Sequence, residues 1–254
     1  MLAVLSPAKN MRPAGTGLPL TPPLFEEKTR RLAEILKGYS AWELESRLAI
    51  NPALAMKAFF MAQDFDPGKL WPPEGGEAGG WPALLAFYGL AYQSMAPEDF
   101  SEAEMLYAQD HLRILSAFYG LLRPLDRILP YRLEMQSKVK AEGQNLYRFW
   151  GDAPARALFA GGETVVNLAS GEYAKALLAH LASGDRLVTC RFEIVRRGRR
   201  LMLATEAKMA RGRMARFLVK NRPEKPEDLR EFEWDGYAFS PALSDARTYV
   251  FQKL

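Results

Sequence analysis

Short strand patterns alternate with helical patterns along the whole sequence, and this alternation constrains the fold more than any other feature. Val4-Leu5 and Val165-Val166-Asn167-Leu168 have the apolar, β-branched composition of buried strands. Residues 191–204 have the pattern of a β-hairpin, and residues 249–251 that of a further strand. Helical patterns lie between them. The sequence therefore predicts an α/β fold (α+β mixed) with a mixed sheet flanked by helices, in a single domain over residues 1–254.

The composition argues against several classes of protein. No apolar run approaches the roughly 20 residues that a membrane-spanning helix needs. Cys190 is the single cysteine, so no internal disulfide can form, and His111 and His180 are the two histidines. A structural zinc site is therefore not expected. No glycine-rich phosphate loop or nucleotide fingerprint is visible. We expect a cytoplasmic protein without a membrane partner, metal or cofactor, and we favour a monomer.

Positive charge is concentrated in one segment. Residues 186–222 contain twelve Lys or Arg against Glu193 and Glu206, a net charge of +10, whereas the whole chain carries +4, which leaves −6 for the remainder. A basic segment on a mildly acidic body can hold a polyanion against one face. The alternative is a basic surface that only faces solvent.

Residues 205–219 have the pattern of an amphipathic helix with one basic side. Glycine inside a helix costs about 1 kcal/mol relative to alanine, so Gly212 indicates close approach by a phosphate backbone or by another helix. We expect this side to contact DNA phosphates through Lys208, Arg211, Gly212, Arg213, Arg216 and Lys220.

Residues 111–132 have the pattern of two helices joined at Gly120. Two helices joined by a glycine turn resemble a helix-hairpin-helix, in which backbone N–H groups face a DNA phosphate. Arg113, Arg123, Arg127 and Arg132 would add charge nearby. The position two residues after Gly120, where this motif carries a second glycine, is leucine, so a plain helical hairpin is the alternative. The five letters Ala-Phe-Tyr-Gly-Leu occur at 86–90 and again at 117–121, and we interpret the first copy as a helix that ends on glycine.

Polar residues follow two of the expected strands. Ser6 and Lys9 follow the first strand, with the Ser-x-x-Lys spacing of some acylating serine enzymes but without that class's companion motifs. Carboxyl ends of strands are where α/β sheets place ligands. The candidate pocket residues are Ser6, Lys9, Asn167, Ser170, Glu172 and Tyr173. For each of them, a local cap or hydrogen bond is the alternative to a functional role.

Several segments along nearly the whole chain form a set of motifs. They are Ser6-Pro7-Ala8-Lys9, residues 115–135 with Tyr-Gly-x-x-Arg-Pro-Leu-Asp and Pro-Tyr-Arg-Leu-Glu-Met, residues 146–151, Asn167-Leu168-Ala169-Ser170 with Glu172-Tyr173, Lys208-x-Ala210-Arg211-Gly212, Met214-x-Arg216-Phe217, Asn221-Arg222 and Gly236-Tyr237. Together, and in this order, these segments resemble the YaaA family.

The resemblance implies a single-domain α/β fold with a helix-hairpin-helix-like element. It also implies binding to duplex DNA, including duplexes with unpaired regions, and a role in surviving hydrogen peroxide with lower free intracellular iron. We expect the effect on iron to be indirect, because two histidines and one cysteine offer few ligands.

The leading hypothesis is therefore a DNA-binding protein of the peroxide response that acts mainly through phosphate contacts. The alternative is an enzyme that acts on a phosphorylated or nucleotide-like substrate. Its pocket would join Lys9, Arg123, Asn167, Glu172 and Lys208 between strand ends.

Overall fold

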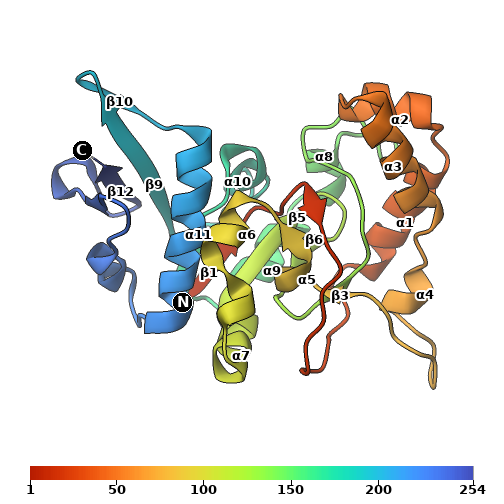
Figure 1. The fold of residues 1–254 in the computed structure, drawn as a ribbon, viewed down its shortest axis with the longest axis horizontal. Coiled ribbons are helices and arrows are strands. Elements are labelled where there is room, and N and C mark those ends of the chain that lie inside the picture. The colour runs from red at the N-terminus through yellow and green to blue at the C-terminus, as the bar shows by residue number, and fades with distance from the viewer. Residues whose placement is uncertain (254) are drawn as a thin grey trace.

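A mixed central sheet organises the computed structural model, which describes residues 1–253 (Figure 1). Its strand order is β11-β12-β9-β8-β1-β5-β6, and β10 pairs with β9 beyond that path. The strands are β1 (Leu2–Leu5), β5 (Leu112–Ser116), β6 (Gly120–Leu122), β8 (Val165–Asn167), β9 (Leu187–Arg196), β10 (Arg199–Leu201), β11 (Tyr237–Phe239) and β12 (Thr248–Lys253). The predicted α/β fold is confirmed.

Because several neighbouring strands of the sheet are parallel, their carboxyl ends lie at the same edge of the sheet. The pairs β5–β1, β1–β8, β8–β9 and β9–β12 are parallel, whereas β5–β6, β9–β10 and β11–β12 are antiparallel. The carboxyl ends of β1 and β8 therefore lie side by side, so the segments that follow them meet. Two small antiparallel pairs lie outside the sheet: β2 (Asn10–Met11) with β4 (Phe87–Tyr88), and β3 (Trp81–Pro82) with β7 (Arg127–Ile128).

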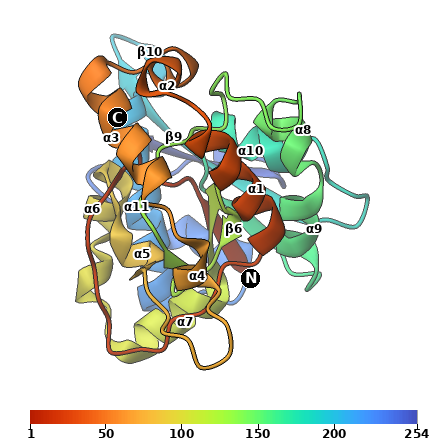
Figure 2. The same cartoon turned by 90° about the vertical axis from the view of Figure 1, so that its right-hand side faces the viewer.

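Helices surround the sheet, and buried apolar side chains from all of these layers form one continuous core. The helix α11 packs against α6 and α7, while α1, α2 and α3 form a group at the opposite end of the molecule (Figures 1 and 2). The helices are α1 (Glu26–Lys37), α2 (Ala41–Leu48), α3 (Pro52–Gln63), α4 (Pro67–Leu70), α5 (Ala83–Ala86), α6 (Leu90–Met95), α7 (Glu102–His111), α8 (Leu146–Trp150), α9 (Ala153–Phe159), α10 (Gly171–Leu178) and α11 (Ala204–Asn221), with short 3-10 turns at Pro97–Asp99, Pro226–Glu231 and Pro241–Leu243. Among residues 1–253, no helix combines the length and the apolarity needed to cross a bilayer.

The predicted helix-hairpin-helix around Gly120 is wrong, because β5 and β6 form a β-hairpin there. Gly120 has a φ of 76° and is buried, and a Cβ atom at this position would lie 2.6 Å from the Trp150 ring. The glycine is therefore needed for the tight turn inside the core, away from any phosphate. Residues 112–116 are almost entirely buried, and a continuous apolar run does not distinguish a buried strand from a helix.

Candidate functional site

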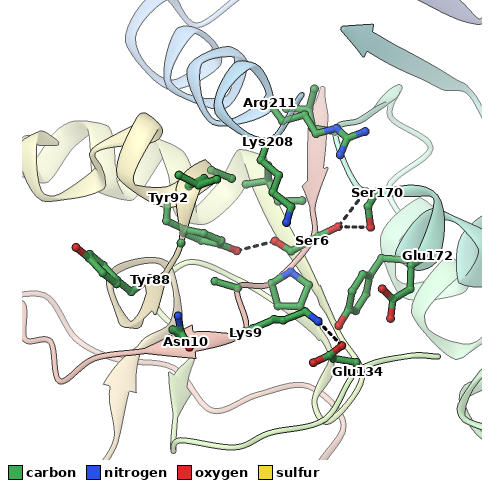
Figure 3. A pocket seen from close by; sticks show the side chains of 18 of the residues that line it. Ser6, Lys9, Asn10, Tyr88, Tyr92, Glu134, Ser170, Glu172, Lys208 and Arg211 are labelled. Atoms are coloured by element: carbon green, nitrogen blue, oxygen red, sulfur yellow. Dashed lines mark hydrogen bonds and ion pairs between the residues drawn. The ribbon is translucent and has the colours of Figure 1, made fainter. Parts of the chain in front are cut away.

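A cavity of about 330 Å³ opens at the carboxyl ends of β1 and β8 (Figure 3). Segments that are distant in sequence form its walls: residues 5–10 after β1, residues 88–92 at the start of α6, residues 131–134, residues 168–173 around the start of α10, and two residues of α11. Ligands of α/β proteins bind at this place in a sheet. The cavity is the candidate site.

Ser6 and Ser170 join the two strand ends at the floor of the cavity. The Ser170 N–H donates to Ser6 Oγ at 2.9 Å, and the Ser6 hydroxyl donates to Ser170 Oγ at 3.2 Å. The Tyr92 hydroxyl donates to the Ser6 carbonyl oxygen at 2.9 Å. Ser6 is therefore held between α6 and α10 and is not paired with Lys9.

Lys9, Arg132 and Glu134 form an ion-pair cluster on another wall. Lys9 Nζ lies 2.6 Å from Glu134 Oε2, and Arg132 Nη2 lies 3.0 Å from Glu134 Oε1. Both carboxylate oxygens of Glu134 are thus paired with cations. Because Lys9 is paired with Glu134, it does not serve as a base for Ser6, and the Ser-x-x-Lys spacing forms no catalytic dyad.

Lys208 and Arg211 enter the cavity from α11 without a carboxylate partner among residues 1–253 (Figure 3). Lys208 Nζ makes no hydrogen bond within that range. The one hydrogen bond of the Arg211 side chain runs from Nη2 to Met202 Sδ at 3.8 Å, and its Nε is buried without an acceptor in the described chain. Burial lowers the pKa of this guanidinium from its usual value. Two positive charges therefore face the cavity uncompensated.

Two tyrosines in the cavity wall are held in their neutral form. Burial raises the pKa of Tyr131 and of Tyr173 well above the usual range. Tyr131 also shares a 2.8 Å hydrogen bond with Ser116 Oγ. These hydroxyls remain protonated at neutral pH and are not suited to act as general bases.

Five of the six predicted pocket residues line the cavity, namely Ser6, Lys9, Ser170, Glu172 and Tyr173. Asn167 does not line it. Its side chain is buried, donates to Thr189 Oγ1 at 3.3 Å and accepts from the Ala169 N–H at 3.0 Å, so it shapes the turn after β8. Arg123 is also outside the cavity.

The α11 residues predicted to contact DNA do not form one free face. A Cβ atom on Gly212 would lie 1.9 Å from the Ala91 carbonyl oxygen, so this glycine permits close packing of α11 on α6. Arg216 Nη1 donates at 2.9 Å to the carbonyl oxygens of Met95 and Ala96, at the end of α6. Lys220 Nζ lies 2.7 Å from Glu104 Oε2.

Arg213 is half-buried beside Trp234, with its guanidinium carbon 5.8 Å from the ring centroid. Of the predicted α11 contacts, Lys208 and Arg211 line the cavity. The prediction that these side chains share one exposed surface is therefore wrong.

The arginines predicted around Gly120 are engaged by the protein itself. Arg113 Nη1 donates to the carbonyl oxygens of Gln109 and Leu112. The interactions of the other three are Arg123 with buried Asp126, Arg127 with the Leu20 carbonyl oxygen and Arg132 with Glu134. These contacts hold loops against the body of the protein.

Sequence reasoning missed Tyr88, Tyr92 and Glu134 as cavity residues. The first two lie within and just after the Ala-Phe-Tyr-Gly-Leu segment at 86–90, which was interpreted as a plain helix end. Glu134 belongs to the Pro-Tyr-Arg-Leu-Glu-Met segment of the resemblance, and that motif was the signal that could have placed it here.

The family is decided by comparison with known proteins. The sequence model of the family described as "Peroxide stress protein YaaA" matches residues 1–243. The chain belongs to the YaaA family. Similar proteins of this family cover it almost end to end. A UPF0246 protein of Lactobacillus johnsonii is 39% identical over 99% of this chain and 97% of its own length. A UPF0246 protein of Caulobacter vibrioides is 40% identical over 100% of this chain and 99% of its own length. A UPF0246 protein of Clostridioides difficile is 34% identical over 100% of both chains.

The cavity is lined by more cationic than acidic side chains. Four cations, Lys9, Arg132, Lys208 and Arg211, line it against the carboxylates of Glu134 and Glu172. Within residues 1–253 no group of three or more His, Cys, Asp or Glu is placed to hold a metal.

Proposed function

We propose that this YaaA-family protein binds a phosphorylated, nucleotide-like small molecule in the cavity after β1 and β8. The observation that carries the proposal is the pair of cations, Lys208 and Arg211, that face the cavity without carboxylate partners in the described residues. Cations left unpaired in a partly enclosed site favour a ligand that brings the compensating negative charge.

The remaining cavity wall suits a flat organic ring. Leu5, Pro7, Ala8, Leu90, Ala91, Leu133 and Leu168 supply apolar surface, and Tyr88 and Tyr92 supply aromatic surface. A volume of about 330 Å³ lies at the lower end of the roughly 300–1,000 Å³ of small-molecule sites, which suits a ligand of mononucleotide size. Glu134 could accept hydrogen bonds from ring or sugar groups, and it is the acid–base candidate if the ligand is a substrate.

Binding to a panel of nucleotides tests the proposal. Isothermal titration calorimetry with the four common nucleoside 5′-monophosphates should find at least one that binds with a Kd below about 1 mM. Leu90→Trp adds bulk at the cavity wall without changing charge, and should weaken binding about tenfold or more. Met56→Trp is the matched control, because Met56 is similarly exposed on α3 and does not line the cavity. Absence of binding, or equal binding by Leu90→Trp, would contradict the proposal.

A second candidate function is the binding of duplex DNA, including duplexes with unpaired regions, in the peroxide stress that the family's description names. The observation that favours it is the β9–β10 hairpin, which projects from the body (Figure 1). Arg196, Arg197 and Arg199 are exposed there and form no ion pair within residues 1–253. Lowered free iron would be an indirect consequence, because the chain has only two imidazole side chains and one thiol to offer as metal ligands.

Salt dependence tests the DNA candidate. Replacing Arg196, Arg197 and Arg199 together by Gln should weaken binding to a labelled duplex and lower the slope of log K against log salt by up to about 3. A control that removes three exposed charges elsewhere, Lys57, Lys140 and Arg148, should leave the slope nearly unchanged. An unchanged slope in the hairpin variant would exclude this surface.

A further inference from the structure

The start of α10 has an unused set of backbone donors at the cavity. Ser170 is the N-cap residue of α10, but its side chain makes no capping hydrogen bond because its Oγ is engaged with Ser6. The N–H groups of Gly171 and Glu172 find no acceptor among residues 1–253. The first N–H groups of a helix carry partial positive charge and bind anions well.

No other part of the described chain covers the side-chain position of Gly171. A Cβ atom built on Gly171 would meet no atom within 4 Å, and the residues on both sides of Gly171 line the cavity. Arg211 reaches toward the same end from α11, as its position beside Ser170 in Figure 3 shows. Lys208 lies above Ser6 in the same view. Two elements, α10 and α11, therefore bring donors to one end of the cavity.

The carboxylates of the cavity are held by other groups. Glu134 is paired through both oxygens with Lys9 and Arg132. Glu172 Oε1 accepts the Gln136 N–H at 3.1 Å. The cations near Glu134 are already paired with that carboxylate, whereas an anion near Arg211 would meet two cations that have no carboxylate partner in the described chain. The unpaired positive charge therefore lies at the α11 end of the cavity, and the paired charges lie at the Glu134 end.

We propose that a phosphate monoester binds with its phosphoryl group between the start of α10, Arg211 and Lys208, and with its organic part toward Leu90 and Glu134. This assignment rests on the proposed nucleotide-like ligand and adds where and how its charged group is held. A monoester dianion matches the two cations in charge, and its three terminal oxygens match the bidentate guanidinium and the helix N–H groups.

Two charge variants test the subsite. Arg211→Gln and Lys208→Gln should each weaken binding of the nucleoside 5′-monophosphate about tenfold or more, and should leave binding of the corresponding nucleoside nearly unchanged. Lys57→Gln, on the exposed surface of α3, is the matched control. Circular dichroism and melting temperature show that each variant is folded. If wild type binds the monophosphate and both variants bind it equally well, the subsite is wrong while the proposed function stands. If wild type binds no nucleotide, the proposed function itself fails.

A backbone variant tests the helix donors separately. Gly171→Pro removes one N–H that the helix does not use, and proline is tolerated at the first helical position. Ser170 has φ −69° and ψ 160°, which the residue before a proline can adopt. Gly171→Ala keeps the N–H. We expect a clear loss of monophosphate binding for Gly171→Pro and a smaller one for Gly171→Ala. If both variants lose monophosphate binding equally, the Gly171 N–H does not contact the ligand.

Ligand chemistry provides the last comparison. A dinucleoside monophosphate carries one negative charge, on its phosphodiester, and has no phosphate monoester. It should therefore bind more weakly than the nucleoside 5′-monophosphate, and inorganic phosphate should compete with the monophosphate. Tighter binding of the dinucleotide would overturn the monoester assignment in favour of a polynucleotide strand.

Discussion

Gly212 shows how one residue fixes the distance between two helices. Alanine at this position would gain about 1 kcal/mol in helix propensity. Its Cβ atom, however, would lie 1.9 Å from the carbonyl oxygen of Ala91, a backbone atom of α6 that cannot rotate away. The clash should prevail, and we expect Gly212→Ala to lower the free energy of unfolding by about 2 kcal/mol in urea titrations. Gly171→Ala, whose Cβ meets nothing, is the control, and an unaltered stability of Gly212→Ala would show that the helices can separate.

Cys190 is the one thiol of the chain, and its environment makes it inert. The side chain is buried in β9, and burial raises the pKa of the thiol to about 12. At pH 8 only about one molecule in ten thousand would carry the reactive thiolate. We therefore expect neither hydrogen peroxide nor iodoacetamide to modify the native protein within minutes, whereas the urea-unfolded chain should react. Intact-mass spectrometry measures both, and rapid labelling of the native protein would contradict this assignment.

At the scale of elements, Arg216 fastens α11 to the end of α6. Its guanidinium donates to two carbonyl oxygens there and lies 3.5 Å from Asp99 Oδ2. Arg216→Ala should lower the free energy of unfolding by about 1–3 kcal/mol. Arg216→Lys should recover only part of this, because a single ammonium cannot replace the planar fork. Arg148→Ala, on an exposed face of α8, is the control. If Arg216→Ala instead weakened DNA binding in a salt-dependent way without lowering stability, Arg216 would belong to a DNA-binding surface.

Elements differ in how far the sequence predicts them. The helix over residues 205–219 is correct because its apolar positions repeat at helical spacing. The β5–β6 hairpin was not predicted, because a strand buried on both faces lacks alternation. The letters Ala-Phe-Tyr-Gly-Leu illustrate the limit. At 86–90 they end α5, form β4 and begin α6, whereas at 117–121 they form the turn after β5 and the first two residues of β6. Tertiary packing, with Trp150 against Gly120, decides between these structures.

At the scale of the whole molecule, the sequence predicts the part of the site that depends on strand ends. Ser6 and Ser170 follow neighbouring parallel strands, so their meeting could be expected. Tyr88 and Glu134 reach the cavity through packing of distant segments, which spacing along the chain does not encode. The charge count of residues 186–222 was correct, but it could not show which arginines bind carbonyl oxygens and which face the cavity or solvent.

The cavity and the β9–β10 hairpin are separate surfaces, so their roles can be separated in a living cell. In a bacterium that lacks its own YaaA-family gene, we expect wild type to restore survival of a hydrogen peroxide pulse. Arg211→Gln should fail to do so, because it removes an unpaired cation from the cavity. The variant with Arg196, Arg197 and Arg199 replaced by Gln should still protect the cell. Colony counts after the pulse measure survival, and immunoblots confirm equal protein levels. The opposite pattern, protection by Arg211→Gln but not by the hairpin variant, would assign the peroxide response to DNA binding at the hairpin, because only that surface would then be required.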